Sequence, residues 1–149
     1  VKEEIAEILQ VCGKTTILKV ILETGEIETL DKVRLASDLA LEAGAHFIKT
    51  STGKYSISAT LHYAFVMCCS ILDYYMKTGV KRGIKVAGGI SNSKSAIQYL
   101  LLVNEVLGEE WLNPELFRIG ASRLLNDILM QLEKERTGIY QSPEYFSIT

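Results

Sequence analysis

Apolar residues recur along the chain at two spacings, and segments of the two kinds alternate from one end to the other. Apolar positions three or four residues apart, the spacing of one helix face, mark helices at 5–12, 33–43, 96–107 and 125–132. A further long segment, 59–78, also reads as helix. Short, continuously apolar runs lie between the helices at 18–22, 47–50, 84–87 and 117–121. Such runs are typical of strands covered on both faces, so the alternation predicts a parallel α/β sheet.

The spacing of the strands indicates repeated strand-helix units. Successive runs, marked by Lys19, Lys49, Lys85 and Ser122, are 30, 36 and 37 residues apart, which suits one βα unit each. We therefore expect one helix followed by four βα units in a single domain, 1–149, with a polar and aromatic tail at 137–149.

Composition excludes several classes of protein. The chain has 149 residues, 48% of them hydrophobic and 23% charged, with a net charge of −2, as in a soluble globular domain. This charge predicts binding neither to nucleic acid nor to an anionic membrane. No apolar run reaches the roughly 18 residues of a membrane span. The acidic N-terminal segment is unlike a secretory signal, which predicts a cytoplasmic location. Three cysteines, of which Cys68 and Cys69 are adjacent, predict free thiols, and with only two histidines no metal site is expected.

Three of the predicted strands carry a lysine, namely Lys19, Lys49 and Lys85. A single lysine in a strand usually extends its ammonium group into solvent, but three in successive parallel strands favour a shared role. Side chains alternate between the two faces of a strand, so Lys49 lies on the other face from Ile48, and Lys85 on the other face from its β-branched neighbours. If the β-branched side chains face the covering helices, the lysines face a barrel interior or a site at its mouth.

Neighbouring lysines indicate amine chemistry. Adjacent strands lie about 4.8 Å apart, so Lys49 and Lys85 are expected to be close. Desolvation and a neighbouring cation both lower a lysine pKa, and a neutral amine can attack a carbonyl to form a Schiff base. The sequence therefore predicts a lysine that forms an iminium with its substrate.

Glycine-containing loops follow three of the strands, at 51–54, 88–91 and 120–122. Glycines let backbone amides approach an anion, and a helix N-terminus adds further donors. Together the loops favour a phosphorylated ligand. The segment 88–95 also approaches the P-loop pattern of nucleotide-binding proteins. Ser93 replaces its second glycine, however, and no apolar strand ends in a magnesium-binding aspartate.

Four segments resemble deoxyribose-phosphate aldolase in order and spacing: LKVILETG at 18–25, FIKTSTGK at 47–54, GIKVAGG at 83–89 and FRIGAS at 117–122. The resemblance implies a class I aldolase on a TIM (β/α)8 barrel that needs no metal or organic cofactor. Its implied reaction is the reversible cleavage of 2-deoxyribose 5-phosphate to glyceraldehyde 3-phosphate and acetaldehyde, a step of deoxyribonucleotide catabolism.

The resemblance also implies roles for individual residues. Lys49 matches the Schiff-base lysine, Lys85 the second lysine of the proton relay, and Lys19 a further lysine that lines the site. The residues matching the family's phosphate site are Gly53, Lys54, Gly88, Gly89, Gly120 and Ser122.

The sequence departs from the family pattern at several positions. Arg123 stands where a second hydroxyl residue is common, and Ser91 where a basic residue is frequent. The aspartates of the family's relay have no substitute here, because all four candidates read as solvated helix residues; these are Asp31, Asp38, Asp73 and Asp127. The family's C-terminal tyrosine could correspond to Tyr140 or Tyr145.

Length limits the architecture. A (β/α)8 barrel typically needs about 250 residues. We therefore expect this chain to supply only about the last four strand-helix units of such a barrel, which form its C-terminal half. The open edges of such a sheet predict pairing with a second copy or with the missing N-terminal half. The first hypothesis is thus an aldolase; the alternative is a catalytically silent sugar-phosphate-binding or interaction module that lacks the relay.

Overall fold

The computed structural model describes residues 1–13, 15–55, 58–142 and 144–146. Its elements are, in chain order, α1 (Lys2–Cys12), β1 (Lys19–Ile21), α2 (Thr24–Ile27), α3 (Leu30–Glu42), β2 (Phe47–Lys49), α4 (Leu61–Thr78), β3 (Gly83–Ala87), α5 (Ser93–Leu107), a 3-10 helix (Glu109–Trp111), β4 (Phe117–Gly120) and α6 (Leu124–Thr137). Of the predicted tail at 137–149, positions 143 and 147–149 lie outside the described residues.

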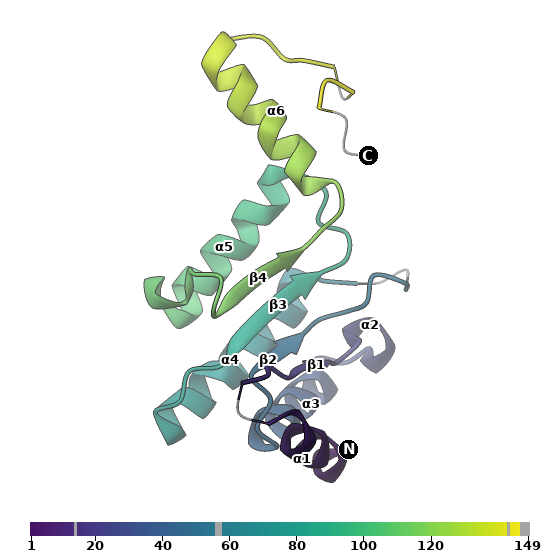
Figure 1. Cartoon of the computed structure of the whole chain (residues 1–149), viewed down its shortest axis with the longest axis vertical. Helices are drawn as coiled ribbons and strands as arrows, with labels where there is room; N and C mark the ends of the chain where they lie inside the picture. Colours follow the sequence, from purple (N-terminus) through teal and green to yellow (C-terminus); the bar gives the residue numbers. More distant parts are fainter. Residues whose placement is uncertain (14, 56–57, 143, 147–149) are drawn as a thin grey trace.

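The four strands form one parallel sheet in the order β1-β2-β3-β4, as the alternating pattern predicts. Figure 1 shows α3, α4 and α5 along one side of this sheet and α6 extending away from its end. Each strand is joined to the next by helix, so every neighbouring pair belongs to a strand-helix-strand unit. The predicted parallel α/β architecture is confirmed.

The two faces of the sheet differ in chemistry. Ile48, Ile84 and Val86 are fully buried in a core shared with Met67 and Ile71 of α4. Each such side chain contributes about 1.5–3 kcal/mol when it leaves water. Lysines alternate with these residues along β2 and β3 and so point to the opposite face. The predicted direction of the lysines is confirmed.

Polar side chains determine where the two longest helices begin. The Thr60 hydroxyl accepts from Tyr63 N at 3.1 Å, and the side-chain Oδ1 of Asn92 accepts from Ser95 N at 2.9 Å. Because a capping residue stands outside the helix that it caps, α4 starts at Leu61 and not at the predicted residue 59. Helix α2 was not predicted, since four residues are too few to show a helical period.

The sheet ends at β1 on one side and β4 on the other, each hydrogen-bonded to a single neighbouring strand within the described residues. A hollow of about 490 Å³ lies between β1 and α3, and its lining includes the apolar side chains of Val20, Ile21 and Leu35. The pairing of these edges with a second copy or another half-barrel stays a prediction. None of the described helices is long and apolar enough to cross a bilayer.

Gly83→Ala should destabilise the fold. A Cβ at residue 83 would lie 2.6 Å from Cδ1 of Phe47, a ring that is almost fully buried. Overpacking of this kind costs about 1–3 kcal/mol, measurable as a lower midpoint of urea unfolding. Gln98→Ala on exposed helix surface is the matched control and should change stability by no more than about 0.5 kcal/mol. Equal midpoints for both variants would contradict the close packing of Phe47 on Gly83.

Candidate active site

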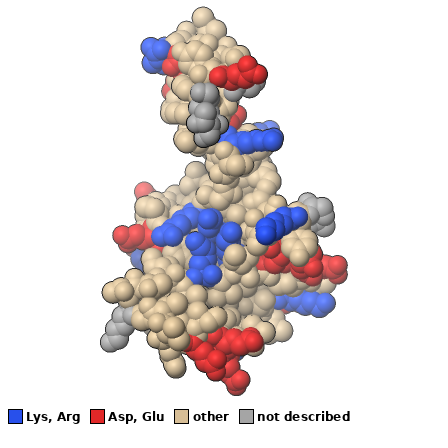
Figure 2. Space-filling model, turned by 45° about the vertical axis from the view of Figure 1, so that its right-hand side comes forward, with Lys and Arg blue, Asp and Glu red and all other residues tan. Residues whose placement is uncertain are grey.

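Strand pairing places four cations on the face of the sheet opposite Ile48 and Ile84: Lys49, Lys85 and Arg118 are in register, and Lys19 is paired with Phe47, two residues before Lys49. Lys49 is paired in register with Lys85, and Lys85 with Arg118 on β4. Burial lowers the pKa of the Lys19 ammonium group, and the positive charges of Lys85, Arg118 and Lys49 lower this pKa further. Figure 2 shows a group of basic side chains near the middle of this face. The sheet therefore presents a cationic row with Lys49 and Lys85 as neighbours, as predicted.

Arg118 is the member of this row that sequence reasoning missed. Its Nε donates to the Pro114 carbonyl oxygen at 2.8 Å, and its guanidinium group lies 4.6 Å from the centre of the Phe47 ring. Lys19 Nζ lies 5.9 Å from the same ring. The sequence contains the feature that identified the three lysines, since Arg118 is also a charged residue within an apolar strand.

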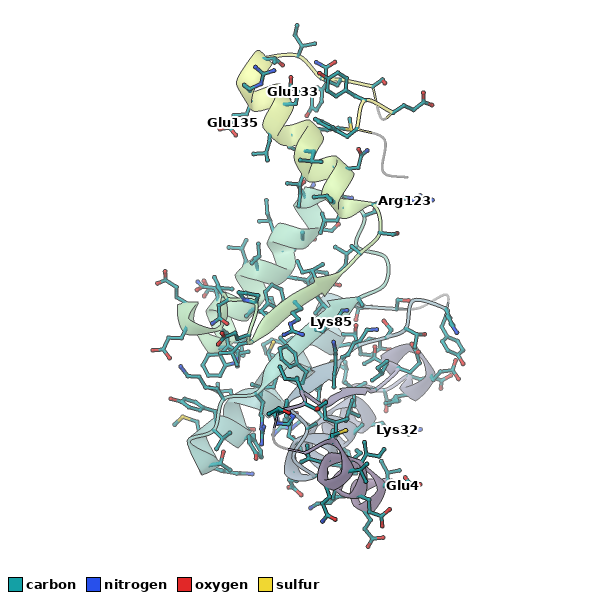
Figure 3. All side chains as sticks on the ribbon, in the orientation of Figure 1. Glu4, Lys32, Lys85, Arg123, Glu133 and Glu135 are labelled. Carbon is teal, nitrogen blue, oxygen red and sulfur yellow. The ribbon has the colours of Figure 1, made fainter. Side chains whose placement is uncertain are left out.

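A pocket of about 430 Å³ opens at the carboxyl ends of β2, β3 and β4. Its size falls within the usual range for small-molecule sites. Among the predicted residues, the pocket wall contains Lys49, Lys85, Gly53, Gly88, Gly89, Gly120 and Ser122. The wall residues that were not predicted as site residues are Thr52, Ala87, Ile90, Ser91, Ala121 and Arg123. Figure 3 shows Lys85 at the sheet and Arg123 at the turn from β4 into α6.

Two predicted site residues lie outside this wall. Lys19 belongs to the cationic row but does not line the pocket, and Lys54 is exposed on the loop after β2. The lysine of the P-loop-like segment, Lys94, lines a separate hollow between α5 and α6. It is therefore not placed where a P-loop lysine would meet a nucleotide phosphate in this pocket.

Glycine at 88 and 120 makes room for polar side chains at the pocket. Gly88 has a φ of 97°, and a Cβ there would lie 2.6 Å from Ser58 Oγ. A Cβ on Gly120 would lie 2.8 Å from Cε of Lys85. Larger residues at these positions would displace Ser58 or Lys85, so the glycines help to shape the site.

Buried hydroxyl groups join the ends of β2 and β3 just below the pocket. The Thr50 hydroxyl donates to the Ala87 carbonyl oxygen at 3.1 Å and accepts from Ala87 N at 3.0 Å. Ser51 Oγ donates to the same carbonyl oxygen, and both side chains are fully buried. These hydrogen bonds hold the loops after Ser51 and Ala87 side by side, because they join the residues from which the two loops start.

The four aspartates have different surroundings, and the expectation that all are solvated was wrong for Asp127. Its Oδ2 accepts from Ser93 N at 2.6 Å and from the Ser93 hydroxyl, so this carboxylate of α6 occupies the start of α5. Asp38 and Asp73 form ion pairs with Arg34, whereas Asp31 is exposed as expected. Of the described residues that line the pocket, none is a carboxylate.

Asp127→Asn should destabilise the protein at neutral pH and much less in acid. The Ser93 hydroxyl and amide hold the pKa of the Asp127 carboxyl below its ordinary value. The ionised carboxylate therefore stabilises the folded state at pH values above about 4, the ordinary pKa of an aspartate. This contribution to the free energy of unfolding is lost as the pH falls through the lowered pKa. Thermal unfolding of both proteins from pH 7 to pH 3 should show a difference in Tm that shrinks with acid. A difference independent of pH would contradict the ionised contact.

Neither candidate tyrosine lines the pocket. The Tyr140 ring lies 3.9 Å from Lys134 Nζ, and Tyr145 packs edge-on against Phe146 with 4.9 Å between ring centres. Both residues follow α6, which leads away from the sheet (Figure 1). The structure therefore assigns neither tyrosine to the site.

Comparisons with known proteins agree with this geometry. The sequence pattern described as DeoC/LacD family aldolase matches residues 1–126. Human deoxyribose-phosphate aldolase is 51% identical over 138 residues, which are 93% of this chain and 43% of that protein. The mouse enzyme of the same name is 49% identical with the same coverage. The chain thus spans about 43% of the length of these curated relatives.

Solved structures show the same arrangement of elements. A Toxoplasma gondii protein, provisionally assigned as a deoxyribose-phosphate aldolase, superimposes with a TM-score of 0.80 at 26% identity, over 89% of this chain and 52% of that one. A second structure from that organism has a TM-score of 0.76 at 23% identity and supports the fold alone. The strand-helix units match about half of these aldolase barrels. Because the family pattern matches residues 1–126, which are most of the chain and include all the residues of the pocket wall, the chain belongs to the DeoC/LacD aldolase family.

Proposed function

We propose that this chain carries the Schiff-base lysine and the phosphate loops of a deoxyribose-phosphate aldolase. The observation that supports it most is the register of Lys49 beside Lys85 at the base of a glycine-lined pocket. The pocket combines an amine nucleophile with backbone groups suited to an anion. The proposed substrate is 2-deoxyribose 5-phosphate, which the reaction converts to glyceraldehyde 3-phosphate and acetaldehyde.

In the proposed mechanism, Lys49 is the nucleophile. Its neutral amine attacks C1 of the open-chain sugar, and loss of water leaves an iminium. Loss of the proton on the C3 hydroxyl then breaks the C2–C3 bond, whose electron pair moves to the iminium nitrogen as an enamine. Glyceraldehyde 3-phosphate leaves, C2 of the enamine gains a proton, and water releases acetaldehyde and the free lysine. We assign to Lys85 the exchange of protons beside Lys49.

The proposed phosphate site is formed by the loops that follow β2, β3 and β4 in the pocket wall. Gly53, Gly88, Gly89 and Gly120 present backbone there, and Ser122 adds a hydroxyl group. Arg123 precedes the first turn of α6, whose N-terminal amides favour an anion. We propose that Arg123 supplies the guanidinium charge for this phosphate, since Ser91 of the same pocket wall carries no charge.

The reaction with acetaldehyde tests the Schiff-base proposal in this chain, because it requires the nucleophile but neither the sugar nor its phosphate. Incubation with acetaldehyde and borohydride should add an ethyl group to Lys49, located by peptide mass spectrometry. An unlabelled Lys49 in the folded chain would refute the proposal.

A second candidate function follows from the absence of carboxylates among the described pocket residues. A catalytically silent sugar-phosphate-binding module would bind glyceraldehyde 3-phosphate without forming the Lys49 adduct. Calorimetric titration with that ligand, run beside the labelling experiment, separates the two functions. Binding without an adduct would support the silent module, whereas adduct formation would exclude it.

A further inference from the structure

We propose that Glu23 is a positioning residue that holds loop 51–54 in the shape that receives the substrate phosphate. This inference rests on the proposed function, because it assigns a role within the same pocket. Glu23 follows β1 and is not part of the pocket wall, whereas Thr52 and Gly53 are. Its effect on the ligand is therefore transmitted through the loop.

The Glu23 carboxylate accepts hydrogen bonds from both donors of one loop residue, the backbone amide and the hydroxyl group of Thr52. Thr52 N lies 3.1 Å from each carboxylate oxygen, and the Thr52 hydroxyl donates to Oε2 at 2.6 Å. Hydrogen bonds to an ionised acceptor are shorter and stronger than neutral ones. They join segments 29 residues apart in the sequence, at the ends of β1 and β2.

The hydrogen bond to Glu23 also leaves the Thr52 hydroxyl oxygen as an acceptor for the rest of the loop. An ionised carboxylate can only accept, so the hydroxyl proton points to Glu23 and the oxygen lone pairs are left for other donors. Lys54 N lies 3.4 Å from this oxygen. The contact therefore orders the turn across Gly53, the residue between them, which has a φ of 85° and lines the pocket.

The backbone at Glu23 is shaped for this contact. Glu23 has a φ of 53° and a ψ of 60°, a left-handed conformation that is costly for a residue with a side chain. Hydrogen bonds on both sides of it fix the chain, from Leu22 N to the Lys49 carbonyl oxygen and from Thr24 N to the Thr50 carbonyl oxygen, each at 2.9 Å. The end of β1 is thus anchored to β2 while the carboxylate reaches Thr52.

Glu23→Gln is the direct test, with inorganic phosphate as the probe. The amide keeps an acceptor for Thr52 N but turns a donor toward the Thr52 oxygen, so the hydroxyl is no longer ordered by a carboxylate. We expect the Kd for phosphate, measured by calorimetry, to rise roughly tenfold, as for the loss of one charge-assisted hydrogen bond. Glu26→Gln, at an exposed position of helix α2, which directly follows Glu23, is the matched control and should leave this Kd unchanged.

A pair of variants at Thr52 separates positioning from a general loss of stability. Thr52→Ser keeps the hydroxyl group and should bind phosphate as the unaltered chain does, whereas Thr52→Val should match Glu23→Gln. If Glu23→Gln does not fold, this pair still decides the question. Unchanged phosphate affinity in Thr52→Val, or no phosphate binding by the unaltered chain, would overturn the inference.

Labelling of Lys49 in the unaltered chain distinguishes this inference from the proposed function. Acetaldehyde labelling of Lys49, together with phosphate binding that ignores Glu23 and Thr52, would overturn the inference alone. Phosphate binding that depends on both residues in a chain without Lys49 labelling would overturn the Schiff-base proposal alone.

Discussion

Lys49→Arg should abolish acetaldehyde-dependent borohydride labelling and lower any cleavage of 2-deoxyribose 5-phosphate by roughly 10³-fold or more, as expected when a covalent nucleophile is removed. The guanidinium group keeps the positive charge of the strand position but stays protonated at every accessible pH and cannot form an iminium. Mass spectrometry of the reduced adduct measures the first effect, and a coupled assay of glyceraldehyde 3-phosphate release measures the second.

Lys32→Arg is the matched control for this experiment. Lys32 lies on α3, well away from Lys85 in Figure 3, and lines the separate hollow beside β1. This variant should retain both the labelling and the rate of the unaltered chain. Adduct formation in Lys49→Arg would show that another lysine is the nucleophile, with Lys85 and Lys19 as the next candidates in the cationic row.

Lys85→Met should slow proton transfer more than it slows iminium formation. Methionine has a similar length but no ammonium group, and loss of a positioned acid or base typically costs about 10²–10⁴-fold in rate. The sensitive measurement is exchange of the methyl hydrogens of acetaldehyde in heavy water, which passes through the enamine. We expect this exchange to fall by that factor, with a smaller loss of borohydride labelling at Lys49.

Gly120→Ala tests the position of Lys85 without removing its amine. The added Cβ would lie 2.8 Å from Lys85 Cε and 3.5 Å from its Nζ, so the side chain must move. The exchange rate should fall, as in Lys85→Met, but by a smaller factor.

One outcome of the Lys85→Met experiment would contradict the role in proton transfer. Equal losses of exchange and of labelling in that variant would instead assign Lys85 to iminium formation itself.

Several features of the site could be predicted from the sequence because they depend on local rules. Side chains alternate along a strand, so the burial of Ile48 already places Lys49 on the other face. Strand-helix spacing likewise predicts that the loops containing Gly53 and Gly88 lie at the same end of the sheet. The pocket contains both glycines, as this rule requires.

Other features required the packed structure because they join distant segments. Asp127 and Ser93 are 34 residues apart, and nothing in the helical pattern of 125–132 shows that its one carboxylate reaches the start of α5. Lys54 belongs to the segment FIKTSTGK at 47–54 that resembles the aldolase family, yet its side chain lies outside the pocket wall. A motif determines which residues are close along the chain but not where a loop turns them.

By itself, the sequence determined the order of the four strands and the five longer helices, the face on which the lysines lie, and the likeness to an aldolase. Only the tertiary structure decided that Arg118 extends the row of Lys49 and Lys85, and that Glu23 holds Thr52. The physical reason is the difference between periodicity and register. Periodicity is a property of a few consecutive residues, whereas register and loop contacts depend on strand pairing and side-chain packing between segments about 30 residues apart.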